Sequence, residues 1–205
     1  VIRQFPELPM FEGDPQRWST DDVVEAFDGY IKKRETGYRP NWWNDVSEVR
    51  RVARMIPQQL MAEYLSRYAK KPEILGDLLP LVKHGRMEAC GDILFSIYRD
   101  CGSSEREGLY ALVVLSAIAA PAHKAAIAED LVSGKLQNDE LMAAGLEVVG
   151  IENLDVGQLT KIFLATGPEN EFDAGQMATT LQHYMLPKLS FEATLKLLSS
   201  LLTAL

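Results

Sequence analysis

Three glycines recur at a nearly constant interval in the second half of the chain, and each follows an apolar run. Gly102, Gly134 and Gly167 are 32 and 33 residues apart, and a new helical pattern begins after each of them. Glycine commonly ends a helix because it adopts left-handed backbone conformations without strain. A repeat of this length is typical of stacked helix pairs, in which each pair covers the apolar face of its neighbour. The interval therefore predicts an all-α array.

Helix start signals agree with this interval from residue 86 onward. We expect helices to begin near residues 86, 104, 122, 139, 155, 173 and 190, with steps of 16 to 18 residues. Ser104 with Glu107 matches a capping box, and Pro121 suits the first turn of a helix. Asn138 precedes two acidic residues, and Ser190 precedes another apolar pattern. Two consecutive steps make one helix hairpin of about 34 residues.

The predicted repeats also share side chains at equivalent positions. Each has a large apolar residue, an alanine and then an aliphatic residue: Tyr110-Ala111 with Val114, Met142-Ala143 with Leu146, and Met177-Ala178 with Leu181. The alanine lets neighbouring helices approach closely, and the aliphatic side chain fills the layer between repeats. With these segments and the glycines, residues 86–205 resemble HEAT- and armadillo-like α-solenoids. We expect a right-handed α-solenoid, a stack of about five or six antiparallel helix hairpins.

The chain divides by pattern into three parts. Prolines alternate with aromatic side chains through residues 1–18, which predicts an extended arm lying on the domain. Residues 19–85 form an irregular helical part, and residues 86–205 form the regular repeats. We expect these parts to make a single continuous solenoid that belongs to a longer polypeptide.

Caps and prolines mark the helices of the irregular part. Ser19 is a plausible cap with an acid three residues later, and a second helix is expected from about Asp45. Pro57 marks the next boundary, either a kink or the first turn of a new helix. Pro72 and Pro80 are expected to bracket one short helix, because proline disrupts a helix interior.

Charge is divided unevenly along the chain. The net charge is −8, but residues 1–86 carry 14 Lys and Arg against 13 Asp and Glu, whereas residues 87–205 carry 7 against 16. The first part is therefore +1 and the second −9. An acidic surface disfavours general nucleic-acid binding, because phosphate contacts need Lys and Arg. It suits a basic protein partner or serves solubility alone, and the sequence leaves both interpretations open.

Both cysteines are expected to be free thiols. Cys90 and Cys101 are predicted to lie on one helix, where 11 residues at about 1.5 Å each separate them by roughly 16 Å. A disulfide needs Cα atoms within about 7 Å of each other. Free thiols fit a reducing compartment, so we expect a cytoplasmic protein. No apolar run approaches the ~20 residues of a membrane-spanning helix, so no membrane association is expected.

The sequence contains no short motif of catalysis or cofactor binding. The phosphate-binding loops GxxxxGK[ST] and GxGxxG and the nucleophile elbow GxSxG are absent. His84, His123 and His183 lie far apart without the spacing of zinc ligands, and Cys90 has no base beside it in the sequence. We therefore expect no catalytic, cofactor-binding or metal site and a protein that is not an enzyme. The alternative is an all-helical enzyme whose site lacks a linear motif.

Basic and aromatic residues before residue 72 form the candidate partner-binding surface. If two neighbouring helices run antiparallel, these residues meet in one patch: Trp42, Trp43, Arg50, Arg51, Arg54, Arg67, Lys70 and Lys71. An acidic protein or a phosphate group would suit this patch, and a nucleic-acid-binding helical array is the corresponding alternative function. The plain interpretation is a solvated face with core tryptophans.

The expected function is that of a protein-interaction or scaffold module. The partner would be another protein or the remainder of a longer chain, bound along one face of the array. The last predicted helix has an apolar stripe at Phe191, Leu195, Leu198, Leu202 and Leu205. Apolar surface at this C-terminal end would promote self-association.

Overall fold

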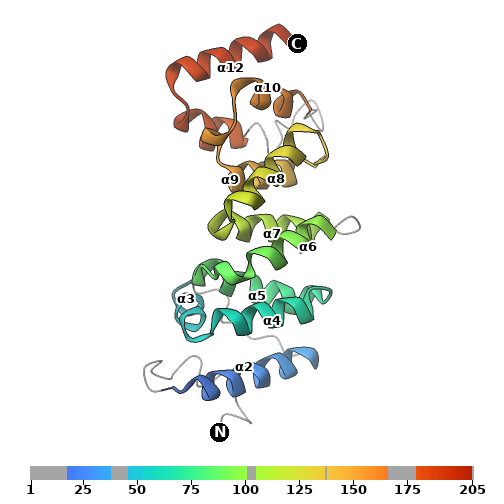
Figure 1. Cartoon of the computed structure of the whole chain (residues 1–205), viewed down its shortest axis with the longest axis vertical. Helices are drawn as coiled ribbons and strands as arrows, with labels where there is room; N and C mark the ends of the chain where they lie inside the picture. Colours follow the sequence, from blue (N-terminus) through green and yellow to red (C-terminus); the bar gives the residue numbers. More distant parts are fainter. Residues whose placement is uncertain (1–17, 38–45, 101–104, 137, 166–178, 205) are drawn as a thin grey trace. The chain divides into compact units, whose positions relative to one another are not determined.

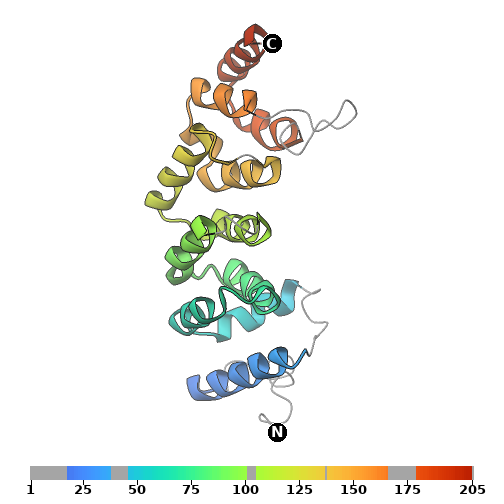
Figure 2. The same cartoon turned by 90° about the vertical axis from the view of Figure 1, so that its right-hand side faces the viewer.

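The computed structural model is all-helical throughout the part of the chain that it describes (Figure 1; Figure 2). The described residues are 18–37, 46–100, 105–136, 138–165 and 179–204. No strand occurs among them, which confirms the predicted all-α class. Contacts between Cα atoms divide the chain into two compact units, Val1–Ile97 (unit 1) and Tyr98–Leu205 (unit 2). No described helix is both long and apolar enough to cross a bilayer.

Unit 1 is organised around one helix, α5. Its helices are α2 (Thr20–Glu35), α3 (Val46–Met55), α4 (Gln58–Tyr68), α5 (Pro72–Gly85), the 3-10 turn η3 (Glu88–Cys90) and the start of α6 (Gly91–Asp100). Helix α5 packs against α2, α3 and α4. The largest side chains enclosed between them are fully buried: Phe27, Tyr30, Ile31, Met61, Leu65, Leu75, Leu78 and Leu81.

The helix starts predicted for residues 19–85 are confirmed where the structure describes them. The Ser19 side chain accepts a hydrogen bond from the backbone N–H of Asp22, and the Asp22 carboxylate accepts one in return from Ser19. The hydrogen bonds that the Ser19 hydroxyl and then the Ser19 backbone N–H donate to the Asp22 carboxylate lower the pKa of Asp22. Pro57 caps α4, and Pro72 occupies the first turn of α5, where a missing backbone N–H costs nothing.

The prediction that Pro80 ends a short helix is wrong, because α5 continues through it to Gly85. A proline inside a helix leaves the carbonyl four residues earlier without its usual donor. That residue is Gly76, which is exposed and has open space around its Cα. Water can therefore hydrogen-bond the freed carbonyl. The helix ends after Gly85, because the following residue, Arg86, has a left-handed φ of 49°.

Unit 2 is built from helices that pack against near neighbours in the sequence. They are α7 (Glu105–Ile118), α8 (Pro121–Val132), α9 (Asp139–Val149), η4 (Ile151–Asn153), α10 (Val156–Leu164), the π-helical turn η5 (Leu181–Met185), η6 (Leu186–Lys188) and α12 (Phe191–Ala204). Helix α9 packs against α7 and α8, and α10 packs against α8 and α12. Figure 1 shows α12, in red, next to α10.

Most predicted starts in this half lie within one residue of the structure. Helices α7, α8, α9, α10 and α12 begin at residues 105, 121, 139, 156 and 191. The start expected near 86 is wrong: the left-handed Arg86 and the turn η3 delay α6 until Gly91. Gly134, with φ of 71°, does follow the end of α8. Gly102, Gly167 and the start near 173 lie outside the described residues.

The most enclosed helix of unit 2 is α9. Every residue from Leu141 to Leu146 is buried, because α7 and α8 both cover it. Gly145 permits the close approach of α8: a Cβ at this position would lie 3.3 Å from the side chain of Leu131. The repeated alanines Ala111 and Ala143 are buried on α7 and α9, which pack together.

Candidate interaction surfaces

The cations predicted on α3 are exposed, with one exception. Arg51 Nη2 donates to Glu48 Oε2 of the same helix at 2.8 Å. Arg50 and Arg54 are exposed one turn apart on α3 and form no ion pair with the described residues. They are therefore the α3 cations that can meet an external partner. The predicted aromatic neighbours of this set lie outside the described residues: Trp42 and Trp43.

The cations predicted at the end of α4 lie against tyrosine rings. The Arg67 guanidinium is 5.7 Å from the centroid of the Tyr64 ring, and Lys71 Nζ is 5.2 Å from that of Tyr68. Lys71 Nζ also lies 2.7 Å from a carboxylate oxygen of Glu35, at the end of α2, and this contact raises the Lys71 pKa. Arg67 and Lys71 are exposed, as Lys70 is, but both also contact groups inside unit 1.

The two sets lie at opposite ends of α5 rather than in one patch. Lys71 directly precedes α5, whereas Arg50 lies near Lys83 and His84 at its other end. Lys83 lies twelve positions after Lys71, a helical rise of roughly 18 Å. The sequence reasoning missed Lys83, which packing between α3 and α5 brings to the same histidine as Arg50. The signal available beforehand was the position of Lys83 at a helix end, which dipole stabilisation alone explains.

The pKa of His84 reflects the positive charges at this end of α5. Its pKa lies below the usual value near 6.5, first because the imidazole is partly buried and then because Arg50 and Lys83 repel a positive charge there. The unfolded chain therefore binds this proton at higher pH than the folded chain. The contribution of neutral His84 to stability is present above the unfolded pKa and is lost as the pH falls through the folded pKa.

Arg50→Gln is expected to raise the pKa of His84, because it removes one of the two charges that disfavour the imidazolium. The measurement is a titration of the His84 ring protons by NMR. Arg67→Gln is the matched control, since Arg67 lies over Tyr64 and is not among the groups that shift His84. An unchanged titration in Arg50→Gln would show that Arg50 does not approach the end of α5.

The histidines and the described cysteine do not form a nucleophilic site. Cys90 is a free, buried thiol, and burial raises its pKa to about 12, so that it stays protonated at neutral pH. His123 is buried and uses Nδ1 to accept the backbone N–H of Ala120 at the start of α8. His183 is exposed on η5. None of these groups is bonded to Cys90 in the described part of the chain.

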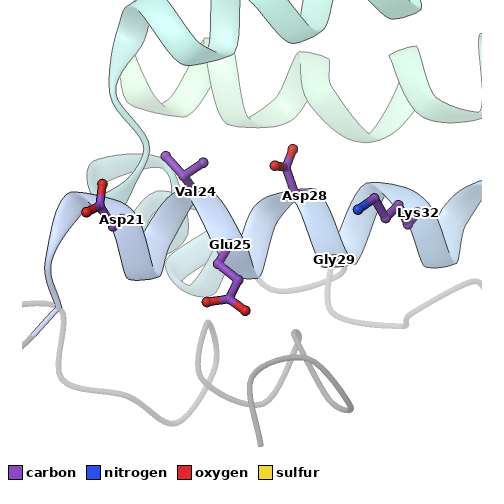
Figure 3. A pocket seen from close by; sticks show the side chains of 6 residues that line it. All are labelled: Asp21, Val24, Glu25, Asp28, Gly29 and Lys32. Carbon is purple, nitrogen blue, oxygen red and sulfur yellow. The ribbon is translucent and has the colours of Figure 1, made fainter.

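An open depression of about 600 Å³ runs along α2 (Figure 3). Asp21, Glu25 and Asp28 line it at one-turn spacing, with Lys32 at the end. Figure 3 shows Glu25 pointing to the side of the helix opposite Asp28, so the carboxylates do not converge. The Tyr64 hydroxyl donates to Asp28. No group of three or more metal-ligating side chains comes together among the described residues, so this face is an acidic, solvated surface.

Helix α12 exposes a continuous apolar stripe. The exposed fractions are 80% for Phe191, 49% for Leu195, 38% for Leu198 and 75% for Leu202. Leu197, on another face of the same helix, is fully buried where α12 packs against α10. Helix α12 is thus apolar on two faces, of which one belongs to the core and the other meets solvent. A folded helix with four adjacent exposed apolar side chains is typical of an interaction surface.

Comparison with known proteins gives no relative from which a role could be transferred: no protein-family model, curated protein or solved structure matches the chain. The candidate surfaces are therefore ranked by their own chemistry. The basic end of α5 carries charges that a helix C-terminus itself stabilises. The helix itself does not stabilise the apolar stripe of α12 in this way. Exposure of these side chains to water costs free energy, which burial against another surface would recover.

Proposed function

We propose that this chain is a non-enzymatic protein-interaction module, built as an α-solenoid of stacked antiparallel helix hairpins. The observation that carries the proposal is the exposed stripe of α12. Large apolar side chains in water cost free energy that a protein partner recovers by covering them. The partner is expected to present an amphipathic helix, because a straight stripe along one helix fits the matching face of another.

Contacts inside unit 2 support the stacked arrangement. Helix α7 packs against α9, and α8 packs against α10, so that each helix contacts the next but one along the chain. Helices α8 and α9 also pack against each other. Alternating contacts of this kind are those of successive hairpins in a solenoid, where each repeat touches only its neighbours. The buried alanines of α7 and α9 occupy the corresponding position in the two helices.

The described chemistry favours binding over catalysis. The buried Cys90 thiol is protonated at neutral pH, and the carboxylates along α2 point in different directions. Among the described residues, another surface depression is lined by Arg106, Leu109 and Asn138 together with Glu140 and Leu141. A further one contains Glu63 and Ser66, one turn apart on α4, but no hydrogen bond joins these two described side chains, so the pairing of nucleophile and base that hydrolysis needs is not formed there.

The test is affinity capture from a native lysate with an immobilised chain, at low and at moderate salt. Phe191→Gln with Leu202→Gln removes the two most exposed members of the stripe and little of the core. Val46→Ser is the matched control, because Val46 is 48% exposed on α3. A protein retained by wild type and control, and reduced at least about tenfold by the double variant, supports the proposal.

Other outcomes contradict this function. Protein retention that is insensitive to Phe191→Gln with Leu202→Gln would remove α12 as the contact surface. Retention of nucleic acid that disappears at moderate salt, and also in Arg50→Gln with Arg54→Gln, would assign the chain to the nucleic-acid-binding class instead. Both variants keep the helix propensity of the original positions high, so loss of folding does not explain such results.

A further inference from the structure

The stripe of α12 has a spacing that is the same from either end. Phe191, Leu195, Leu198 and Leu202 follow one another at four, three and four residues. Alternation of three and four is the spacing of the apolar seam in a two-stranded coiled coil. Because the order four, three, four is symmetric, an antiparallel copy of α12 presents the same spacing to it. The stripe is therefore self-complementary in the antiparallel orientation.

The charge around α12 permits the approach of a second copy. Residues 87–205 carry a net charge of −9, which opposes association through most of their surface. Residues 179–204 carry Lys188, Glu192 and Lys196 as their charged side chains. Lys196 Nζ lies 2.9 Å from Glu192 Oε1. Helix α12 and the described residues just before it are thus nearly neutral within an acidic part of the chain, which reduces the repulsion between two copies that meet there.

We propose that α12 pairs with α12 of a second copy of this chain in antiparallel orientation. This proposal rests on the proposed function and names the partner of that same surface. Phe191 of each copy faces Leu202 of the other, and Leu195 faces Leu198. The successive layers of contacting side chains along the pair therefore have similar widths. A parallel pair would place two phenylalanine rings at one end. The antiparallel pair also aligns the helix dipoles favourably.

The size of the stripe is that of a small interface, which is typical of weak, reversible association. At about 200 Å² for each fully exposed side chain, the four exposed fractions correspond to roughly 500 Å² of apolar surface per copy. A standard stable interface buries about 800 Å² per partner. We therefore expect a dissociation constant in the micromolar range, so that the dimeric fraction depends on the protein concentration.

Sedimentation equilibrium of the whole chain tests the pairing, over about 1–200 µM to span micromolar affinities. Phe191→Gln with Leu202→Gln is expected to weaken dimerisation at least about tenfold, because four side chains leave the interface. Val46→Ser is expected to dimerise as the wild type does. A wild-type chain that stays monomeric over the whole range, or a dimer that the double variant does not weaken, overturns the proposal.

Disulfide cross-linking tests the orientation, in a Cys101→Ser background in which Cys90 stays buried. A chain with Phe191→Cys mixed with a chain with Leu202→Cys is expected to give a cross-linked heterodimer under mild oxidation. Phe191→Cys alone is expected to give little, because its two copies would be roughly 16 Å apart along the pair. The opposite result, efficient cross-linking of Phe191→Cys to itself, overturns the antiparallel arrangement.

Failure of this proposal and failure of the proposed function are distinguishable. A monomeric chain that still retains a different protein through α12 overturns self-pairing and leaves the interaction function in place. A monomeric chain whose captured proteins are insensitive to the α12 variants overturns both. Far-UV circular dichroism of each variant checks that the helices remain folded, which is expected because Val46, Phe191 and Leu202 are exposed.

Discussion

Replacing Asp77 with alanine is expected to lower the free energy of unfolding by about 3–5 kcal/mol, the usual cost of removing one partner from a buried ion pair. Asp77 Oδ2 accepts hydrogen bonds from the Tyr30 hydroxyl, at 2.9 Å, and from Arg34 Nε. The exposed fractions are 12% for the Asp77 side chain and 7% for that of Arg34, and Tyr30 is fully buried. Asp77→Ala therefore leaves a charge and a hydroxyl in the core of unit 1. Urea unfolding, followed by circular dichroism, measures the loss.

A double-mutant cycle separates the charge from the hydrogen bond at this position. Asp77→Asn keeps an acceptor for Tyr30 but removes the negative charge that faces the Arg34 guanidinium, so most of the loss should remain. Arg34→Met with Asp77→Asn removes both charges and should recover most of it. Simple additivity of the two single substitutions, within about 0.5 kcal/mol, would show that the buried charge is not the cause.

The helix starts of this chain were predictable because the signals that determine them are local. Ser19 with Asp22, and Asn138 with the following backbone N–H groups, form their hydrogen bonds within one turn of the helix. The misplaced start at residue 86 depended on a left-handed arginine, a conformation that glycine or asparagine usually adopts. The continuation of α5 through Pro80 depended on the exposure of Gly76, which only the packed structure determines.

The candidate surfaces were predictable only in part, because they depend on which helices pack together. The apolar stripe of α12 was evident in the sequence, but periodicity does not say which of two apolar faces enters the core; Leu197 is buried and the stripe is exposed. The basic patch was expected across α3 and α4, whereas packing of α3 on α5 groups Arg50 with Lys83. Contacts such as Tyr30 with Asp77 join residues 47 positions apart, beyond the reach of local patterns.

Unit 2 contains a cluster around Asp130 that corresponds to the Asp77 cluster of unit 1. Here we expect the hydrogen bond from a tyrosine to contribute more to stability than the ion pairs do. Asp130, on α8, accepts a hydrogen bond from the Tyr98 hydroxyl at 2.7 Å and another from Arg99 Nη1 at 3.0 Å. Lys135 Nζ lies 3.4 Å from the same carboxylate. The carboxylate and the tyrosine are buried, but the side chains of Arg99 and Lys135 are 33% and 58% exposed. Water can solvate both cations when the carboxylate is removed.

Asp130→Ala is accordingly expected to lower the free energy of unfolding by about 2–3 kcal/mol, mainly because the buried Tyr98 hydroxyl loses a charged acceptor. Asp130→Asn should cost less than about 1 kcal/mol, since it keeps an acceptor and ion pairs with exposed cations contribute little. Tyr98→Phe removes the hydroxyl that donates to Asp130, so Asp130→Ala should cost much less in that background. The same urea unfolding measurement checks the order of the variants. If Asp130→Asn proves as damaging as Asp130→Ala, the exposed cations depend on this carboxylate as strongly as Arg34 depends on Asp77, and the two clusters are energetically alike.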